Sequence, residues 1–518
     1  MFDYAIRNGT IVDGTCQKPY RAAVYIQDGK IASISRDNDA PAAMELDAAG
    51  KIVSPGFIDM HSHSDIDSFP DEKRESKLFQ GVTLEVTGSC GYSAFPFGDK
   101  NREETLKLYS IRPELQTVNT FADFKKTVER YGYPTHLKCQ VGHGTLRGFV
   151  MGLEKRPPTA REMERMKQVL DDELKAGAAG LSLGLIYPPG SFCETEELIE
   201  LAKVVQANGK FLSVHMRSEG ERIFRALEEM LLVARETGVQ LQISHLKLMG
   251  TGMWGRAEEL LQRLEEARSQ GISVTCDQYP FTATSTKLGA ILPDWAHDGG
   301  TARMLDRLRD RPSGLMEAAA AAIENRGGAE GVVISATYGK APSCDGKSLR
   351  ELAREQAATP VEAAFQLLIR TEGKAVCVYH CISPEDMKQI MRDRQIAVGS
   401  DGSAVTYDRS VRAAAHPRFY GTFPRFLQTV RENDLMPLED AVYKMTGLSA
   451  GILKIPDRGV LREGNRADIT IFDYPRVRDM CTYANPVARP EGIEAVFVEG
   501  VLAARGDMLL NGACGRVL

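Results

Sequence analysis

The chain has 518 residues, 43% of them hydrophobic, which is enough for one large domain with a real core and a smaller second domain. Its 64 basic and 70 acidic residues give a net charge of −6, and no run rich in Lys and Arg predicts a nucleic-acid partner. The start MFDYAIRNGT has no signal-peptide pattern, no apolar stretch approaches roughly 20 residues, and the ten cysteines lack the spacing of a disulfide framework, so we expect a cytoplasmic globular protein without a membrane span.

Both ends of the chain consist of short strand-like runs separated by glycine turns. Asn8-Gly9 and Asp28-Gly29 separate such runs near the N-terminus, which is the strongest short hairpin signal. Glu499-Gly500 marks a similar turn near the C-terminus. Because chain ends often lie close together in folded domains, we expect residues 1–53 and 456–518 to form one small β-sandwich domain.

The middle of the chain, residues 54–455, alternates strand-like runs with helical patterns. Thr159 and Glu162 form a capping-box pattern before an amphipathic helix, and a second helix is expected over 195–207. The runs GLSLGLIYP, FLSVHMR and QLQISHL read as strands between the helices. Units of about 30 residues predict parallel strands with crossover helices, and several of them favour a distorted (β/α)₈ TIM barrel over an open sheet.

One segment, at about 287–350, interrupts this alternation with loops, an Ala-rich helix and a single strand-like run. We expect it to be an insertion that covers the active site. The later run CVYHC contains two cysteines and a histidine, but the spacing is not a standard metal motif, so it is interpreted as a buried strand.

Several strand-like runs end in a residue that can bind a metal. FIDMHSHSD ends in His61 and His63, which point to the same face if they lie on a strand. The other such runs end in Cys90, His215, His245 and Asp401. A single histidine at a strand end is usually a core residue, but the carboxyl ends of barrel strands converge on one site, so the set is informative. Zinc prefers this mixture of imidazole, thiolate and carboxylate.

These motifs resemble those of a known family. PGFIDMHSHSD after a β-rich segment resembles the amidohydrolase superfamily of metal-dependent (β/α)₈ hydrolases. More narrowly, GVTLEVTGSCGYSAFP, SVHMRSEG, DQYPFTATST and HPRFYGTFPRFL resemble the N-acyl-D-amino-acid deacylases, also called D-aminoacylases, and the similarity covers nearly the whole chain. The resemblance implies hydrolysis of the amide bond of N-acyl-D-amino acids to a carboxylate and a free D-amino acid.

The resemblance also implies the metal ligands. Many superfamily members bridge two metals with a carboxylated lysine on the fourth strand, but the run GLSLGLIY contains no lysine, and Cys90 takes its place as ligand. One tight Zn²⁺ site would consist of Cys90, His215 and His245. A second, weaker site would consist of His61, His63 and Asp401. Asp401 is the implied general base, which takes a proton from water and then delivers it to the departing amine.

The substrate contacts implied by the resemblance form a carboxylate-binding pocket. The planar guanidinium of Arg418 suits bidentate binding of the α-carboxylate. The segment SAVTYDRSVRAAA just before it adds Arg409 and Arg412, so three arginines are candidates for this contact. The other implied contacts are Lys247, expected on the same strand face as His245, and the hydroxyl groups of Tyr187, Tyr279 and Ser285.

Two other functions are compatible with the sequence. A cyclic-amide hydrolase of the hydantoinase or dihydropyrimidinase kind shares the fold and the metal chemistry, although the absence of a fourth-strand lysine argues against it. A non-catalytic scaffold would have lost its ligands, whereas all of them are present here. A small-molecule substrate is the partner that we expect, and the sequence leaves its acyl group, its side chain and the oligomeric state of the protein open.

Overall fold

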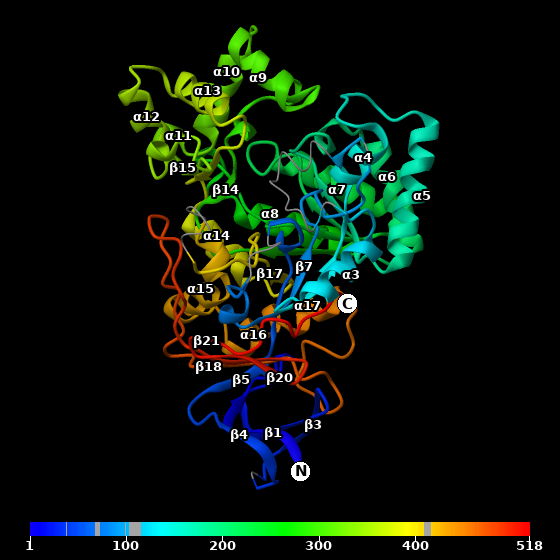
Figure 1. Cartoon of the computed structure of the whole chain (residues 1–518), viewed down its shortest axis with the longest axis vertical. Helices are drawn as coiled ribbons and strands as arrows, with labels where there is room; N and C mark the ends of the chain where they lie inside the picture. The colour runs from blue at the N-terminus through cyan, green and yellow to red at the C-terminus, as the bar shows by residue number, and fades with distance from the viewer. Residues whose placement is uncertain (38, 68–72, 99, 103–114, 116, 409–415) are drawn as a thin grey trace.

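The structure is a computed structural model that describes residues 1–37, 39–67, 73–98, 100–102, 115, 117–408 and 416–518. Figure 1 shows three parts along the long axis: a sheet at the bottom that contains the N-terminus, a barrel in the middle, and a mainly helical lobe at the top. Within the described residues, no helix is long and apolar enough to cross a membrane.

A closed barrel of parallel strands forms the centre of the molecule, as predicted. Around the barrel its strands are β6 (Phe57–Asp59), β7 (Val82–Thr87), β8 (His136–Cys139) with β9 (Val141–Gly142), β10 (Gly180–Gly184), β11 (Phe211–His215), β12 (Gln240–Ile243), β13 (Val274–Gln278) and β17 (Ile396–Val398). β8 and β9 share the third of the eight positions, on either side of Gln140. The barrel closes where the Met60 N–H donates to the Val398 carbonyl, at 3.1 Å.

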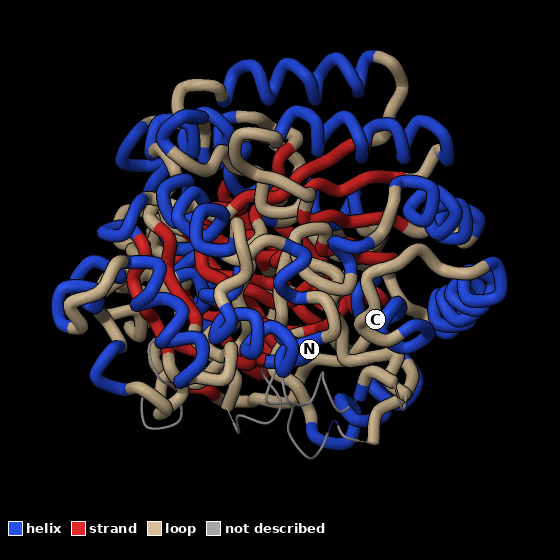
Figure 2. The backbone as a smooth tube through the Cα atoms, turned by 90° about the horizontal axis from the view of Figure 1, so that it is seen from above, coloured by secondary structure: helices blue, strands red, loops and turns tan. Residues whose placement is uncertain are grey.

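Helices cover the outside of the barrel (Figure 2). They are α3 (Phe121–Tyr131), α4 (His143–Met151), α5 (Ala160–Ala176), α6 (Thr195–Ala207), α7 (Ile223–Thr237), α8 (Ala257–Ser269), α14 (Pro384–Arg392), α15 (Arg418–Asn433), α16 (Leu438–Met445) and α17 (Gly447–Ile452). The predicted capping box of Thr159 and Glu162 begins α5, and α6 has the predicted bounds. All residues of β10 and β11 are buried because both faces of a parallel barrel strand are covered.

A nine-stranded sheet contains strands from both ends of the chain. Its strands are β1 (Phe2–Ile11), β2 (Tyr20–Gln27), β3 (Lys30–Ser35), β4 (Ala42–Asp47), β5 (Ile52–Pro55), β18 (Ile469–Phe472), β19 (Ile493–Val498), β20 (Val501–Arg505) and β21 (Met508–Leu509). The two ends meet where β5 pairs antiparallel with β18. Asp28-Gly29 and Glu499-Gly500 are the predicted hairpin turns.

The prediction of a turn at Asn8-Gly9 is wrong. These residues lie inside β1, at a point where the pairing with β2 shifts register between Ile6 and Gly9. Asn8 has a φ of 61°, so the left-handed conformation that the Asn-Gly pair favours produces a bulge within the strand instead of a reversal of the chain.

The lobe is inserted between β13 and β17 and lies at the top of Figure 1. Its elements are the strands β14 (Thr284–Lys287), β15 (Val332–Ala336) and β16 (Val376–Tyr379) and the helices α9 (Gly300–Asp310), α10 (Leu315–Asn325), α11 (Gly328–Gly331), α12 (Leu349–Glu355) and α13 (Pro360–Arg370). The predicted strand in CVYHC is β16, which pairs antiparallel with both other strands. The lobe sheet therefore extends beyond the segment at about 287–350 to Tyr379.

Candidate functional site

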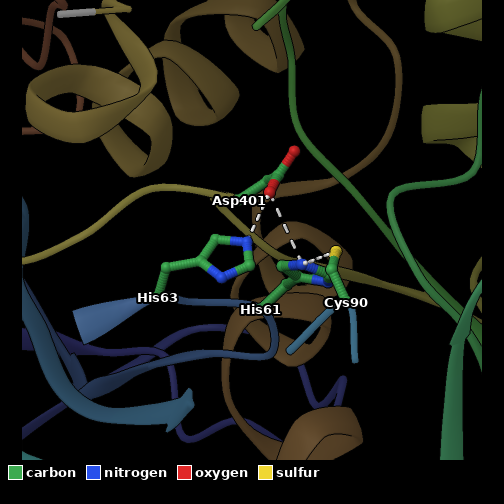
Figure 3. A group of neighbouring side chains, drawn as sticks. All are labelled: His61, His63, Cys90 and Asp401. Carbon is green, nitrogen blue, oxygen red and sulfur yellow. Dashed lines mark hydrogen bonds and ion pairs between the residues drawn. The ribbon is translucent and has the colours of Figure 1, made fainter. Parts of the chain in front are cut away.

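The six candidate ligands lie together at the carboxyl ends of the barrel strands. His215 is the last residue of β11, whereas Cys90, His245 and Asp401 lie in the turns that follow β7, β12 and β17. Figure 3 shows His61, His63, Cys90 and Asp401 pointing toward one another. The end of β11 and the turns after β6, β7, β12 and β17 therefore supply one cluster of donor atoms.

The expectation that His61 and His63 lie on a strand needs correction, because β6 ends at Asp59 and both histidines follow it. Between them the Ser62 N–H donates to the Val86 carbonyl at 2.8 Å, and the His63 N–H donates to the Gly402 carbonyl at 3.0 Å. One hydrogen bond goes to β7 and the other to the segment that follows β17, and together they replace the regular ladder. They hold the two imidazoles on the same side of the barrel, as the strand would have done.

One set of donor atoms consists of Cys90, His215 and His245. The Cys90 Sγ lies 3.6 Å from His215 Nδ1 and 3.4 Å from His245 Nε2. All three side chains are buried, and their donor atoms lie within 4.8 Å of one another. This is the set that the sequence analysis assigned to a tight zinc site.

A second set shares the same thiol. His61 Nε2 lies 3.3 Å from Cys90 Sγ and 3.5 Å from Asp401 Oδ1, and His63 Nε2 lies 3.0 Å from that oxygen (Figure 3). Cys90 therefore belongs to both sets, and its thiol could serve as a ligand in either one.

Three of these residues have an unusual backbone. Cys90, His245 and Asp401 have φ values of 53°, 38° and 51°, in the left-handed region that side chains other than glycine disfavour. Such a conformation costs roughly 1–2 kcal/mol per residue and is concentrated at functional sites. All three residues follow closely on a barrel strand and contribute to the donor cluster.

The turn at Cys90 packs tightly against the fourth strand. A Cβ atom added to Gly184 at the end of β10 would overlap the Cys90 carbonyl oxygen. The turn therefore requires glycine at this position. Since β10 has the sequence GLSLG, the fourth strand brings no lysine to the site, and the thiol lies beside it instead.

The electrostatics of the cluster favour an ionised thiol. Burial alone would raise the pKa of Cys90, but His61 and His245 outweigh it and lower that pKa well below its usual value. Burial would also raise the pKa of Asp401, yet Arg418 and His245 hold it well below its ordinary range. Thiolate and carboxylate are the forms that bind metals, so the donor set fits a cation such as Zn²⁺.

Two buried carboxylates that sequence reasoning missed support the ligands. Asp277, at the end of β13, accepts a hydrogen bond from the His245 N–H at 2.8 Å and lies 3.6 Å from His61 Nδ1. Glu219 lies 2.9 Å from His245 Nδ1 and 3.6 Å from His215 Nε2. Two features of the sequence could have identified them. Asp277 lies near the end of the seventh barrel strand, and Glu219 lies four positions after His215.

A cavity of about 400 Å³ opens beside the donor atoms. Its lining includes Tyr187, His215, Lys247, Tyr279, Ser285 and Asp401. The Tyr279 hydroxyl has no hydrogen-bond partner among the described residues and is therefore available to a ligand. On the lobe side, Ala318 and Ala322 of α10 complete the lining, so the lobe forms one wall of the cavity.

Arg418, the first residue of α15, contacts two residues of the cavity lining, Asp401 and Ser285. Its Nη1 lies 2.7 Å from Asp401 Oδ2, and its Nη2 donates to the Ser285 carbonyl at 3.2 Å. Its Nε has no hydrogen-bond partner among the residues that the structure describes. The alternative arginines, Arg409 and Arg412, lie outside the described residues.

Lys247 is buried but is not on a strand, since β12 ends at Ile243 and Lys247 follows in the turn. Its Nζ donates to Glu219 Oε1 at 2.5 Å and to the His245 carbonyl at 2.9 Å. The prediction that His245 and Lys247 share one face of a strand is therefore wrong. Both residues lie in the turn after β12, where the Lys247 ammonium group contacts His245 directly.

A third group of possible ligands, His143, Cys193 and Glu197, is also buried. Here Arg147 Nε lies 3.4 Å from Glu197 Oε1, and Arg217 donates to the Cys193 Sγ at 3.4 Å. Burial raises the pKa of Cys193 to about 12, so the thiol is protonated. Two guanidinium groups and a neutral thiol disfavour a cation, and we interpret this group as structural.

Comparison with known proteins places the chain in a family. Residues 44–504 match the model of the Amidohydrolase family. The chain is 32% identical to D-aminoacylase from Alcaligenes xylosoxydans xylosoxydans, over 100% of this chain and 97% of that protein. It is 34% identical to N-acyl-D-glutamate deacylase from the same organism, over 96% of this chain and 93% of that protein.

A solved structure gives the same result. The N-acyl-D-glutamate deacylase from Bordetella bronchiseptica, in complex with zinc and a phosphonate inhibitor that mimics the tetrahedral intermediate, superimposes with a TM-score of 0.84. It is 31% identical, and the match covers 100% of this chain and 99% of that one. The chain belongs to the amidohydrolase family, in the branch that contains the D-aminoacylases and the N-acyl-D-amino-acid deacylases.

Proposed function

We propose that this protein is a zinc-dependent deacylase that hydrolyses the amide bond of N-acyl-D-amino acids and releases a carboxylate and a free D-amino acid. The observation that carries the proposal is the buried Cys90 thiol, shared by two donor sets, next to the carboxylate of Asp401, which lines the cavity and pairs with Arg418. The D configuration of the substrate is supported by the activities of the relatives.

Two sets of residues would hold the metal. Cys90, His215 and His245 would bind one Zn²⁺ tightly, and His61, His63 and Asp401 would bind a second one more weakly beside the shared sulfur. Bound zinc supplies Lewis-acid polarisation of the amide carbonyl. The chain's own residues orient the substrate and move the protons.

Asp401 is the proposed proton carrier. Its Oδ2 is held by Arg418 at 2.7 Å and its Oδ1 by His63 at 3.0 Å, so the carboxylate is ionised and fixed at the edge of the cavity. It can accept a proton from the attacking water at one oxygen and deliver that proton to the nitrogen of the departing amine. Amide cleavage requires the second transfer because an amine leaves readily only after protonation.

The α-carboxylate of the substrate would bind between Arg418 and Lys247. The hydroxyl of Tyr279, which lines the cavity, and the Nε of Arg418, which pairs with the cavity residue Asp401, are unpartnered donors that an anionic group bound there would satisfy. The Arg418 guanidinium also lies over the Tyr279 ring, 5.4 Å from its centroid, which fixes its plane. Tyr187 and Ser285 line the same cavity and would supply further polar contacts.

Hydrolysis of a cyclic amide is the weaker proposal. A hydantoin ring has no free carboxylate, so it would leave the donors of Arg418 and Tyr279 without partners in a buried site. The fourth strand also provides no lysine, and the Cys90 turn lies against Gly184 at its end.

We expect Arg418→Lys to raise the KM for N-acyl-D-amino acids by about 10–100-fold, because lysine cannot reproduce a bidentate contact worth about 1.5–3 kcal/mol. Steady-state kinetics on the zinc-loaded protein measure this change. Arg425→Lys is the matched control, since Arg425 lies on the same helix and pairs with Asp479 at 2.7 Å. An unchanged KM in Arg418→Lys would show that another group binds the carboxylate.

The substrate class is tested with three compounds: N-acetyl-D-leucine, its α-carboxamide N-acetyl-D-leucinamide, and a hydantoin. We expect the zinc-loaded protein to hydrolyse the first, to act poorly on the second because it lacks the carboxylate, and to leave the hydantoin intact. Opening of the hydantoin ring without hydrolysis of N-acetyl-D-leucine would contradict the proposed function.

A further inference from the structure

The geometry points to Glu219 as a positioning residue that sets the tautomers of the two histidines of the tight zinc site and joins that site to Lys247. The inference rests on the proposed function in one respect, since it takes Cys90, His215 and His245 as zinc ligands. It concerns a carboxylate that lies outside both sets of proposed metal ligands.

Glu219 lies in the loop after β11, four residues beyond His215, and only 7% of its surface is exposed. Its carbonyl oxygen accepts a hydrogen bond from the Met249 N–H at 2.8 Å. The loop after β11 is thereby tied to the loop after β12, which carries His245 and Lys247. Glu219 thus connects the two loops through its backbone as well as through its side chain.

The two histidines present different nitrogens to the Cys90 sulfur. His245 presents Nε2, at 3.4 Å, whereas His215 presents Nδ1, at 3.6 Å. A histidine that binds a metal through one nitrogen carries its proton on the other. The tight site therefore needs opposite tautomers, with the proton on Nδ1 of His245 and on Nε2 of His215.

One carboxylate faces both of these protonated nitrogens. Glu219 Oε1 lies 2.9 Å from His245 Nδ1, and Oε2 lies 3.6 Å from His215 Nε2. The second distance is longer than a hydrogen bond, and His215 Nε2 has no hydrogen-bond partner among the described residues, so Glu219 Oε2 is the charged group that it faces. An ionised carboxylate only accepts hydrogen bonds, so it favours an N–H at both positions.

The same carboxylate holds Lys247. The ammonium group donates to Glu219 Oε1 at 2.5 Å and lies 3.0 Å from His245 Nδ1. With the proton on Nδ1 of His245, the ammonium group and the imidazole N–H are both donors, and they need an acceptor that both can share. Glu219 is that acceptor, and it links the metal-binding histidine to the cation that we propose binds the substrate carboxylate.

Glutamine cannot replace this carboxylate. Its side chain has one oxygen acceptor and one NH₂ donor, so at least one of the three groups around it would face a donor instead of an acceptor. Neutralisation would also leave the buried Lys247 ammonium without its counter-charge. Aspartate keeps the charge and both acceptors, but its shorter side chain cannot reach all three groups at the same time.

The test measures zinc retention by the full-length zinc-loaded protein in competition with a chromogenic chelator. We expect Glu219→Gln to weaken zinc binding by about 10–100-fold, the usual loss when a group that orients a metal ligand is removed, and Glu219→Asp to have an intermediate effect. Glu197→Gln is the matched control, because Glu197 is equally buried and lies 2.7 Å from His143 Nε2 away from the zinc ligands.

Wild-type zinc affinity in both Glu219 variants would overturn the inference. Glu219→Asp, which retains the buried charge, provides this test even if Glu219→Gln does not fold. Equal zinc loss in Glu197→Gln would also overturn it, since the loss would then reflect removal of any buried carboxylate. Zinc retention is measured without substrate. A wild-type protein that binds zinc but fails to hydrolyse N-acyl-D-amino acids would contradict the proposed function and leave the inference about Glu219 standing.

Discussion

Asp401→Asn is expected to lower kcat by about 10²–10⁴-fold, the usual contribution of a positioned general acid or base, while the protein retains its tightly bound zinc. The amide of asparagine can neither accept the proton of the attacking water nor deliver one to the departing amine. Zinc retention follows from the geometry, because Cys90, His215 and His245 form a set of their own that does not include Asp401.

Zinc content and steady-state kinetics on the same preparation measure both parts of this prediction. Asp386→Asn is the matched control: Asp386 is buried and accepts hydrogen bonds from the N–H groups of Gly255 and Ala257 at the start of α8. We expect this control to keep its turnover. Undiminished kcat in Asp401→Asn would eliminate the proposed proton carrier, and loss of the tight zinc would show that Asp401 belongs to that site.

Cys90→Ala is expected to abolish tight zinc binding and, with it, turnover. The sulfur is the atom common to both donor sets, and the lowered pKa of its thiol makes it the anionic ligand between four imidazoles. Structural zinc sites with four protein ligands are worth about 10–16 kcal/mol, or about 2.5–4 kcal/mol per ligand, so loss of the thiolate should weaken zinc binding roughly 70–900-fold.

The matched control is Cys276→Ala, which changes a buried cysteine of β13 that packs in the barrel core. It should lose some thermal stability but keep its zinc and its activity. Metal analysis after extensive dialysis separates the two variants. A Cys90→Ala protein that still contains zinc and hydrolyses substrate would show that the histidines and Asp401 bind the metal without the thiolate. The proposed role of Cys90 as an essential ligand would then be wrong.

Local patterns in the sequence predicted much of the fold. The capping box at Thr159 and the bounds of α6 follow from side-chain preferences within a few residues, which tertiary contacts did not override. The Asn8-Gly9 pair shows the limit of such patterns. It predicts only the left-handed backbone that Asn8 adopts, and whether that produces a turn or a bulge depends on the pairing of β1 with a distant segment.

The lobe illustrates the same limit at longer range. Its central strand, β16, pairs with β14 about 90 residues earlier in the chain, as between Thr286 and Cys377. No local sequence pattern predicts that these two strands pair with each other. The sequence therefore predicted β16 as a strand, but only the structure shows that the lobe extends as far as this strand.

The candidate ligands were predicted because barrel strands converge at one end, and the structure brings all six together. The positive φ values of His245 and Asp401 were not predictable, because their N–H groups donate to distant partners, the Asp277 carboxylate and the His61 carbonyl. Glu219 was missed because its importance comes from three partners, His215, His245 and Lys247, which it reaches only in the folded barrel.

The most direct test of the central claim is the hydrolysis of paired N-acetyl-D- and N-acetyl-L-amino acids by the purified, zinc-loaded protein, followed by chiral analysis of the released amine. Methionine, leucine, phenylalanine and glutamate derivatives should be compared in parallel. The account predicts turnover of D-enantiomers, loss of that turnover after zinc is removed by a chelator, and its return when zinc is restored. Turnover confined to L-enantiomers, or no turnover of either series with zinc verified in the protein, would contradict it.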